Sequence, residues 1–351
     1  MSESTESREA SYPLNMPVDW EPPYPSFMSE FHESKHVVVM CLIGCQFDNG
    51  ARDAALEMVQ GIRTMMLESG EAAYVDLSEC DADSAGRCQL VATGYWFDPA
   101  LLQQLFGSDE FESFWQSHSD SQRGYGVFRE VFNFPMSRFE TLHSGPDHLV
   151  GIANVRDGIT DPIPQHAYWG SMRDRIPDAV RDRFEAQSQV EVLEQNDHSV
   201  TVRPNLNLAI IRSGQDITDA AGQEREQYLD DVEPTLVSGM NFLRDEGEEV
   251  RCYDCRFLRF VDEQGEALDH TYGYAYFQSL EELEKWAEHH PSHKAIFGSF
   301  LEFAPKYGDN MRSRFWHEVA VLPASNQFAQ YVNCAPGTGL LRGLTNLWPA
   351  D

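Results

Sequence analysis

The sequence predicts an α+β fold built from two similar halves, and two observations favour it. The chain has 351 residues, enough for about two domains or one large duplicated one, and 42% of them are hydrophobic, so a sizeable core is expected. Segments of the first half also recur in order in the second half. The stretch from His36 resembles that from Asn205, TGYWFDPALLQQL from Thr93 resembles YGYAYFQSLEELEKW from Tyr272, and VFREVFNF from Val127 resembles FWHEVAVL from Phe315.

The matched segments give each half a simple order of elements: strand, helix, strand, helix, strand. With one more edge strand this is the ferredoxin-like order, in which an antiparallel sheet carries its helices on one face. Two such halves packed sheet to sheet would form a barrel-like core. We expect the halves at residues 35–145 and 205–345, a Pro-rich extended arm at 1–34, and a connecting insertion at 146–204 that matches neither half.

The matched positions also say where the halves differ. Gly44 falls opposite Ser213, and Arg129 falls opposite His317. The offset between matched positions grows slowly along the chain, as small loop insertions would cause. The second copy thus carries a hydroxyl and an imidazole where the first copy has a glycine and an arginine.

The charge and cysteine content oppose several functional classes. Lys and Arg number 26 against 57 Asp and Glu, and the resulting net charge of -31 repels nucleic acid and anionic membranes. No apolar run approaches the roughly 18 residues of a membrane-spanning helix, and the N-terminus lacks a signal-peptide core. The 7 scattered cysteines do not suggest a disulfide framework, so a reducing cytoplasm is the expected location. The one CxxC, at 252–255, lies in a strand-like stretch and is predicted to be structural.

Common catalytic motifs are missing from the sequence. It contains no dinucleotide-binding GxGxxG after a strand, no GKS/T phosphate loop and no GxSxG nucleophile elbow. His289 and His293 have the spacing of a helical metal-binding pair, but Pro291 lies between them and would break the helix. Nucleotide-binding, zinc hydrolase and serine hydrolase functions are therefore weakly supported.

The first histidine with a possible chemical role is His293. Ser279 and Glu282 form a capping box for one helix, and Pro291 should end that helix and begin the next. An imidazole at the head of an aromatic helix face could bind a flat cofactor through an axial bond, whereas a capping or surface histidine is the simpler alternative. The residues predicted to share that face are His293, Ile296, Phe297 and Phe300.

The second candidate is His317, in the predicted strand FWHEVAVL. Side chains alternate along a strand, so His317 shares a face with Phe315, Val319 and Val321. It could be a hydrogen-bonded core histidine or a general acid/base whose pKa is tuned by burial. Ser213 ends another predicted strand, where it could meet a pocket or serve only as a turn residue.

Several long segments resemble the haem-containing aldoxime dehydratases, from about Pro23 to Leu341. The resemblance is specific because uncommon sequence segments, several of them long, occur in the same order. They are GYW at 94–96, RFETLHSG at 138–145, YWGSMRDR at 168–175, LAIIRSGQD at 208–216, KWAEHHPSHKAIFGSF at 285–300, WHEVAVL at 316–322 and YVNCAPGTGLL at 331–341.

The resemblance implies a haem b, ferrous in the active state, and a lyase that converts an aldoxime to a nitrile and water. By position, the family's proximal haem ligand falls on His293 and its distal catalytic histidine on His317. The serine that holds the oxime hydroxyl falls on Ser213, the distal arginine on Arg175, and the acid that supports the distal histidine on Glu140. The resemblance also implies a homodimer, with the haem in the C-terminal half.

Other functions remain compatible with the residues alone. A peroxidase-like or chlorite-dismutase-like haem enzyme would share the architecture, as would a cofactor-free α+β-barrel monooxygenase. A haem-binding protein without catalysis is a further alternative. The expected partner is a small aldoxime, aliphatic or arylalkyl, with no nucleic acid and no membrane.

Overall fold

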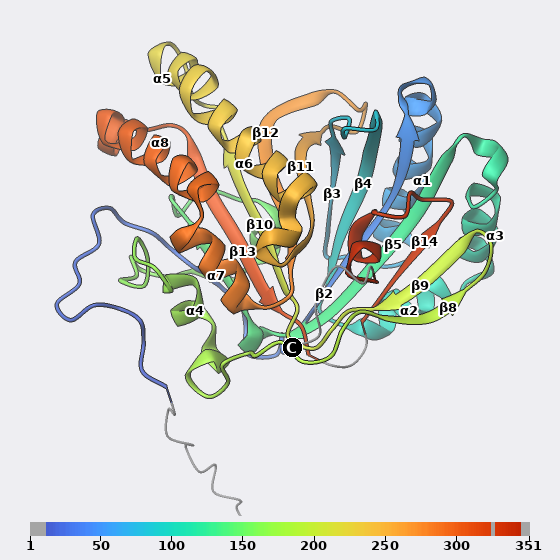
Figure 1. Cartoon of the computed structure of the whole chain (residues 1–351), viewed down its shortest axis with the longest axis horizontal. Helices are drawn as coiled ribbons and strands as arrows, with labels where there is room; N and C mark the ends of the chain where they lie inside the picture. The colour runs from blue at the N-terminus through green and yellow to red at the C-terminus, as the bar shows by residue number, and fades with distance from the viewer. Residues whose placement is uncertain (1–11, 324–326, 345–351) are drawn as a thin grey trace, which may run out of the picture.

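The computed structural model describes residues 12–323 and 327–344, and it shows a curved antiparallel sheet with helices packed along its outer face (Figure 1). The first half of the chain forms a group of four strands and three helices. They are β2 (Val37–Asp48), α1 (Arg52–Glu68), β3 (Tyr74–Cys80), β4 (Arg87–Trp96), α2 (Pro99–Phe106), α3 (Asp109–His118) and β5 (Tyr125–Pro135).

The second half has the same succession of strands and helical segments. A short π-helix, Tyr228–Val232, joins its first two helices. The elements are β10 (Ala209–Asp216), α5 (Gln223–Gln227), α6 (Glu233–Glu246), β11 (Cys252–Val261), β12 (Ala267–Phe277), α7 (Leu280–His289), α8 (Pro291–Tyr307) and β13 (Arg314–Val321).

The remaining elements lie outside these two groups. Most of them extend the sheet or flank the second group. They are β1 (Ser29–Glu30), β6 (Phe139–His143), β7 (Gly158–Ile159), α4 (Ser171–Arg175), β8 (Glu191–Gln195), β9 (Ser199–Arg203) and β14 (Phe328–Val332).

One open sheet of 12 strands contains both groups, in the order β6-β13-β10-β12-β11-β3-β4-β2-β5-β14-β9-β8. The strand order is the same in both groups. In the first group β5 lies beside β2, β2 beside β4, and β4 beside β3. In the second group β13 lies beside β10, β10 beside β12, and β12 beside β11. The groups meet where β11 pairs with β3. The predicted α+β class is thus confirmed. The predicted packing of two separate sheets into a barrel is wrong, because the β11–β3 pairing joins both halves edge to edge in one antiparallel sheet, which stays open along its described strands.

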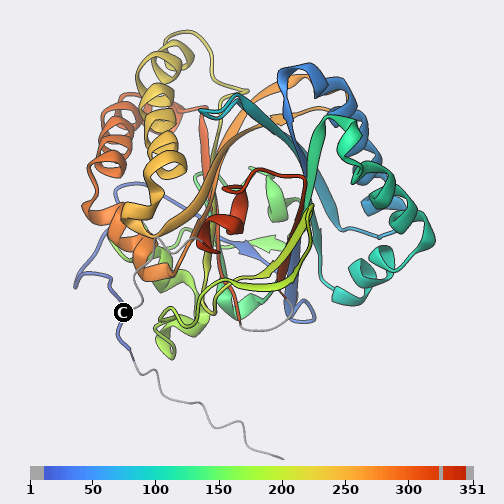
Figure 2. The same ribbon diagram turned by 45° about the vertical axis from the view of Figure 1, so that its right-hand side comes forward.

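The sheet is buried on both faces, as β2 illustrates. Its sequence VVVMCLIGC has no polar alternation because each face packs against an apolar layer. Figure 2 shows the sheet curving around the C-terminal segment, whose Leu340 and Leu341 join the inner core. On β2, Val38, Met40 and Leu42 face this inner core, whereas Val39, Cys41 and Ile43 face the helices.

The helices of the second half cover the outer face of their strands, and local sequence signals set where two of these helices begin. The Ser279 hydroxyl accepts a hydrogen bond from the Glu282 amide at 3.3 Å, and α7 begins at the next residue, Leu280. Pro291 is the first residue of α8, which confirms the predicted boundary between the two helices. Cys252 and Cys255 are buried on β11, where burial raises the pKa of both thiols and supports the predicted structural role.

The arm packs against the insertion and β6, and the insertion reaches both ends of the sheet. Residues 1–11 of the arm lie outside the described residues, as does residue 345 at the end of the predicted second half. From Tyr12 the arm runs extended; its Asn15 amide donates to Asp174 and its Phe27 pairs with His143 of β6. The insertion supplies α4 and the β8–β9 hairpin, which continues the sheet beyond β14.

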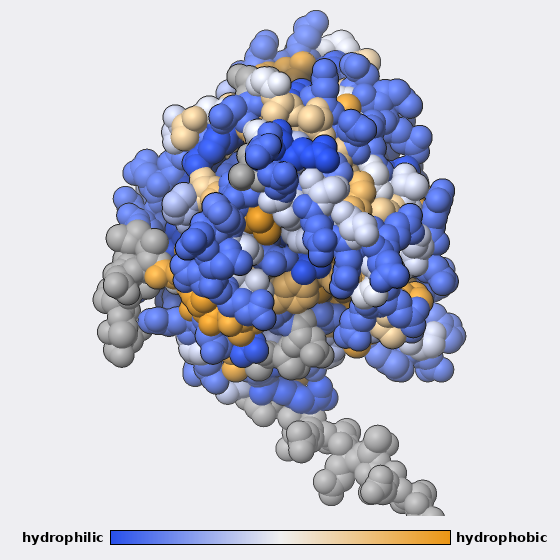
Figure 3. Space-filling model, turned by 90° about the vertical axis from the view of Figure 1, so that its right-hand side faces the viewer, coloured by the Kyte–Doolittle hydropathy of each residue, from blue (hydrophilic) through white to orange (hydrophobic). Residues whose placement is uncertain are grey.

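The surface agrees with the acidic composition. Figure 3 shows a mostly hydrophilic face on the side of the first half, with apolar residues in small patches. Within the described part of the chain, no helix has both the length and the apolar character needed to cross a bilayer.

Candidate active site

A cavity of about 380 Å³ lies between the outer face of the second strand group and its helices. This volume is within the range of small-molecule sites. Ser213 of β10, His317 of β13 and His293 of α8 all line it. Three residues that the sequence marks as candidates are therefore brought to one space by the fold.

His293 is held in the form that binds a metal. Its Nδ1 lies 2.7 Å from the carbonyl oxygen of Ala287, at the end of α7. Because a carbonyl can only accept, Nδ1 carries the hydrogen and Nε2 keeps its lone pair. Burial lowers the pKa of His293 to about 4, although the bond to Ala287 opposes this, so the ring is neutral at neutral pH.

The local sequence explains this geometry. The last carbonyls of a helix have no partner within it, and Pro291 turns the chain so that His293 reaches back to one of them. The ring also packs edge-on against Trp286, with centroids 4.7 Å apart. The imidazole is thus fixed before any ligand arrives, as supporting hydrogen bonds commonly fix metal-binding histidines.

An apolar wall continues from His293 along α8. The predicted face is confirmed, since Ile296, Phe297 and Phe300 all line the cavity. Phe300 packs edge-on against Phe315 of β13 at 4.9 Å between centroids. These side chains form a wall suited to a large, flat, apolar group.

His317 contacts both members of a buried ion pair. Its Nε2 lies 2.6 Å from Nη2 of Arg175 and 3.2 Å from Oε1 of Glu140. When Nε2 lacks a hydrogen it can accept from the guanidinium, and when it carries one it can donate to the carboxylate. The contacts therefore support either protonation state of the imidazole.

Glu140 and Arg175 form a two-pronged ion pair. Nε of Arg175 lies 2.7 Å from Oε2 of Glu140, and Nη2 lies 3.0 Å from Oε1. The side chains are 0% and 1% exposed for Glu140 and Arg175. Burial raises the pKa of Glu140, but Arg175 and then His317 outweigh burial and lower it to about 2, so the carboxylate stays ionised.

Strand register brings Glu140 and Ser213 to His317. Ser213 is directly opposite His317 on the neighbouring strand, and Glu140 is opposite Val319, two residues further along. Directly opposite and diagonal residues of an antiparallel pair share a face and lie within side-chain reach. Among the described residues, no group hydrogen-bonds the Ser213 hydroxyl, which leaves it available to a ligand in the cavity.

The cavity also has walls that the sequence did not indicate. Tyr24 of the arm and Trp169 before α4 line it, and the Trp169 ring lies 5.4 Å from that of Phe297. Glu284 lines it as well, paired at 2.6 Å with the buried Arg173. Tyr24 and Trp169 lie in segments without helical or strand periodicity, so pattern reasoning could not find them. Glu284 lies on the predicted helix, but its pairing with Arg173 has no local signal in the sequence.

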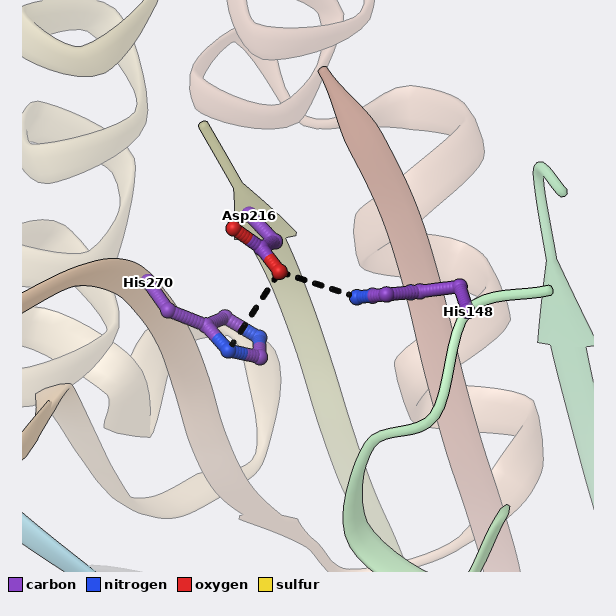
Figure 4. A group of neighbouring side chains, drawn as sticks. All are labelled: His148, Asp216 and His270. Atoms are coloured by element: carbon purple, nitrogen blue, oxygen red, sulfur yellow. Dashed lines mark hydrogen bonds and ion pairs between the residues drawn. The ribbon is translucent and has the colours of Figure 1, made fainter. Parts of the chain in front are cut away.

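Three further titratable side chains form a cluster beside the cavity without lining it. Figure 4 shows His148, Asp216 and His270 meeting at one carboxylate oxygen, at 3.2 Å from His148 and 4.0 Å from His270. Their ligand atoms lie within 4.8 Å of one another, as in a metal site. However, the Trp316 indole donates to Nε2 of His270 at 3.0 Å, which puts the hydrogen of a neutral His270 on Nδ1, facing Asp216. We interpret the group as a hydrogen-bonded network.

Comparison with known proteins places the chain in a family. The model of the haem-containing dehydratases matches residues 41–340. Aliphatic aldoxime dehydratases of Rhodococcus globerulus and Pseudomonas chlororaphis are each 38% identical, over 331 and 332 residues and 93% of both chains. A phenylacetaldoxime dehydratase of Bacillus sp. (strain OxB-1) is 30% identical over 336 residues, again with 93% of both chains covered.

Solved structures agree with the sequence comparison. A crystal structure of an aldoxime dehydratase in complex with butyraldoxime has a TM-score of 0.89 at 37% identity, covering 95% of this chain and 93% of that chain. A second aldoxime dehydratase crystal structure also has a TM-score of 0.89, at 36% identity. Similarity of sequence and of fold thus extends over nearly the whole chain, and the chain belongs to the family of haem-containing dehydratases.

Proposed function

We propose that this protein is an aldoxime dehydratase, a lyase that converts R–CH=N–OH into a nitrile and water at a haem. One observation carries the proposal: a neutral His293 and the ion-pair-supported His317 line the same cavity, with the Ser213 hydroxyl beside His317. The match to aldoxime dehydratases over 93% of the chain supports the same activity.

The residues of the cavity fit a haem b. His293 offers a lone pair on Nε2, and the apolar wall of Ile296, Phe297 and Phe300 suits the face of a macrocycle. A ferrous haem held there would supply an iron centre that can bind the oxime nitrogen and weaken the N–O bond. His293 is thus proposed as the residue that would ligate the haem iron.

The acid/base work is assigned to His317. Its protonated ring gives a proton to the departing hydroxyl, which leaves as water, and its neutral ring then takes the proton from the oxime carbon. One proton is given and one is recovered, so the step needs no other proton source. Nε2 keeps its hydrogen in both states and donates it to Glu140, so Nδ1 is the nitrogen that gives one proton and then takes the other. Arg175 holds the Glu140 carboxylate in place.

Ser213 is proposed to bind the oxime oxygen. Its hydroxyl can donate a hydrogen bond to that oxygen as negative charge develops during N–O cleavage. Because the strand register fixes Ser213 opposite His317, the same oxygen can meet both the hydrogen bond and the proton. A fixed donor at this position stabilises the transition state more than the bound substrate.

Anaerobic turnover tests the proposed function. Purified protein loaded with haem and reduced with dithionite should convert a panel of aliphatic and arylalkyl aldoximes to nitriles, read by chromatography. Folded protein that binds no haem would overturn the proposal. Hydrogen peroxide turnover without aldoxime turnover would instead favour a peroxidase-like enzyme.

We further propose that the two strand groups are copies of one ferredoxin-like unit, with the insertion at 146–204 between them. Their identical strand order supports this, and so do Glu130 and Glu318, which occupy matched positions and are both buried on the inner face. A homodimer and a reducing cytoplasmic location complete the proposal. They rest on the resemblance and on the scattered cysteines, and light scattering would test the dimer.

A further inference from the structure

The first half contains a second cavity, of about 440 Å³. It lies between α2, β5, β14 and the β8–β9 hairpin, away from the candidate active site. Its lining is mixed. The apolar part includes Leu102, Phe106, Val131 and Phe328, and the uncharged polar part consists of Gln103, Asn133, Thr201, Gln327 and Gln330. The charged side chains that line it are Arg129, Arg203 and Glu194.

Arg129 is a partly buried cation without an acidic partner. Its Nε donates to Oε1 of Gln330 at 2.9 Å, and no carboxylate among the described residues lies within 4.0 Å of its guanidinium. By contrast, each fully buried arginine pairs with at least one Asp or Glu. Those arginines are Arg173, Arg175, Arg212 and Arg256.

Aromatic rings take the place of the missing acid. The guanidinium carbon of Arg129 lies 4.9 Å from the Phe106 centroid, 5.0 Å from that of Trp115 and 5.6 Å from that of Phe328. Ring faces attract a cation but do not neutralise it. Because an arginine stays protonated in proteins, a positive charge remains beside the cavity of a chain whose net charge is -31.

The position of Arg129 parallels that of the catalytic histidine. Arg129 precedes the buried Glu130 on the fourth strand of its group, as His317 precedes the buried Glu318. Since side chains alternate along a strand, the side chains of Arg129 and His317 both project from the outer face of the sheet, which the helices cover. Each of them lines a cavity. The cavity of the first half thus occupies the matched place, with a fixed cation where the second half has a titratable ring.

We propose that this cavity binds a small carboxylate with an apolar tail. The planar fork of a guanidinium matches the two oxygens of a carboxylate, and the tail would lie on Leu102, Val131 and Phe328. Among the described lining residues, Arg129 is the cation without a carboxylate partner, so one singly charged carboxylate balances its charge better than a multiply charged phosphate does. The other two charged lining residues leave Arg129 available. Arg203 pairs with Glu191 at 3.1 Å, and the exposed Glu194 forms no ion pair with Arg129.

Calorimetry with benzoate and its neutral analogue benzamide tests the site on the haem-loaded protein. Benzoate should bind saturably at one site per chain, at least about tenfold more tightly than benzamide, because only the anion forms charge-assisted bonds to the guanidinium. The Soret band should not move, since the haem is not involved. Binding that shifts the Soret band and is lost in His317→Ala would place benzoate in the active site and overturn the proposal.

Three variants separate the contribution of the Arg129 charge from that of the cavity space. Arg129→Gln should weaken benzoate by about tenfold or more, and Arg129→Lys should fall between it and the parent protein, because lysine keeps the charge but not the fork. Leu102→Trp fills the cavity and leaves the guanidinium in place, so it should abolish binding even if Arg129→Gln does not fold. Undiminished benzoate affinity in Leu102→Trp, or no saturable binding to the parent protein, would refute the proposal.

Discussion

Ser213 and His317 are paired directly across two neighbouring antiparallel strands, β10 and β13. Their side chains share the outer face of the sheet, so the register of one strand pair sets the distance between the proposed hydrogen-bond donor and the proposed acid/base. A slip of one residue would turn one of them to the inner core. The proposed catalytic arrangement is therefore fixed by the pairing of these two strands.

Ser213→Ala tests the proposed donor to the oxime oxygen. The variant should retain haem and lose nitrile formation by about a hundredfold or more, mainly in kcat, because the bond strengthens as charge develops. Steady-state kinetics on protein normalised to its Soret absorbance measures this. Ser299→Ala, which removes a hydroxyl bonded to a carbonyl of α8, is the matched control and should keep the parent rate. An unchanged kcat in Ser213→Ala would remove the serine from the mechanism.

His293→Ala tests the proposed axial ligand. The variant should fold but lose most of its haem, because no other nitrogen is held neutral at that position. Absorbance at the Soret band per folded protein is the measurement, and added imidazole should restore part of the band. His289→Ala is a close control, since His289 lies four residues earlier and its side chain is 68% exposed. Full haem content in His293→Ala would assign the ligand elsewhere.

Acid should release haem through the same residue. The pKa of His293 is lowered to about 4 by burial, so the ring is neutral above that pH and protonates as the pH falls through it. A protonated imidazole has no lone pair for iron, and haem should dissociate as the pH approaches about 4. Bound iron competes with the proton, so the midpoint should lie at or below this value. A Soret titration with circular dichroism in parallel separates haem release from unfolding.

Glu140→Gln tests the buried ion pair with Arg175. Removing one charge leaves the buried guanidinium uncompensated, which costs roughly 3–5 kcal/mol of unfolding free energy. The lowered pKa of Glu140 also makes its contribution complete above about 4.5 and lost as the pH falls toward about 2. Urea unfolding at several pH values should thus show a shallower loss of stability in the variant over that window.

The exposed pair of Glu191 and Arg203 supplies the comparison. Its side chains are 63% and 46% exposed, and solvent screens such pairs, so Glu191→Gln should change stability by less than about 1 kcal/mol. Equal effects of the two substitutions would mean that the Glu140 pair is not the buried, paired site described above.

Local sequence signals predicted the parts of the site that depend on neighbouring residues. The capping box at Ser279 and the stop at Pro291 predicted the junction that orients His293, and strand alternation placed His317 with Val319. The resemblance identified Glu140, but its pairing with Arg175 depends on how β6 and α4 meet in three dimensions. Alternation alone gave no sign of that contact.

The inner face of the sheet shows what hydropathy cannot predict. Glu318 is 2% exposed and would be assigned to a surface by its charge alone. Its carboxylate instead accepts from the hydroxyl of Tyr95, at 2.6 Å, in the opposite half of the chain. Burial of a charged side chain is tolerated only when hydrogen-bond partners compensate for the lost solvation. Here the order of strands in the sheet, and no local sequence pattern, brings Tyr95 to Glu318.

Neighbours on β13 should have separable effects, which gives a further prediction. His317 faces the cavity, whereas Glu318 faces the inner core, where it accepts from Tyr95 and from the Ile152 amide at 2.8 Å. Glu318→Ala leaves both donors buried without an acceptor and should cost roughly 2–5 kcal/mol of unfolding free energy. Its folded, haem-loaded fraction should still turn over, because the carboxylate does not reach the cavity.

His317→Ala should behave in the opposite way. Glu140 and Arg175 remain paired with each other without the imidazole, so stability should fall less than in Glu318→Ala. Haem and substrate binding should persist while nitrile formation is lost, because no other base is placed to exchange both protons. Denaturant unfolding and single-turnover assays on the same two preparations give both readouts. Loss of turnover in folded Glu318→Ala, or retained turnover in His317→Ala, would show that the acid/base function does not belong to the cavity side of this strand.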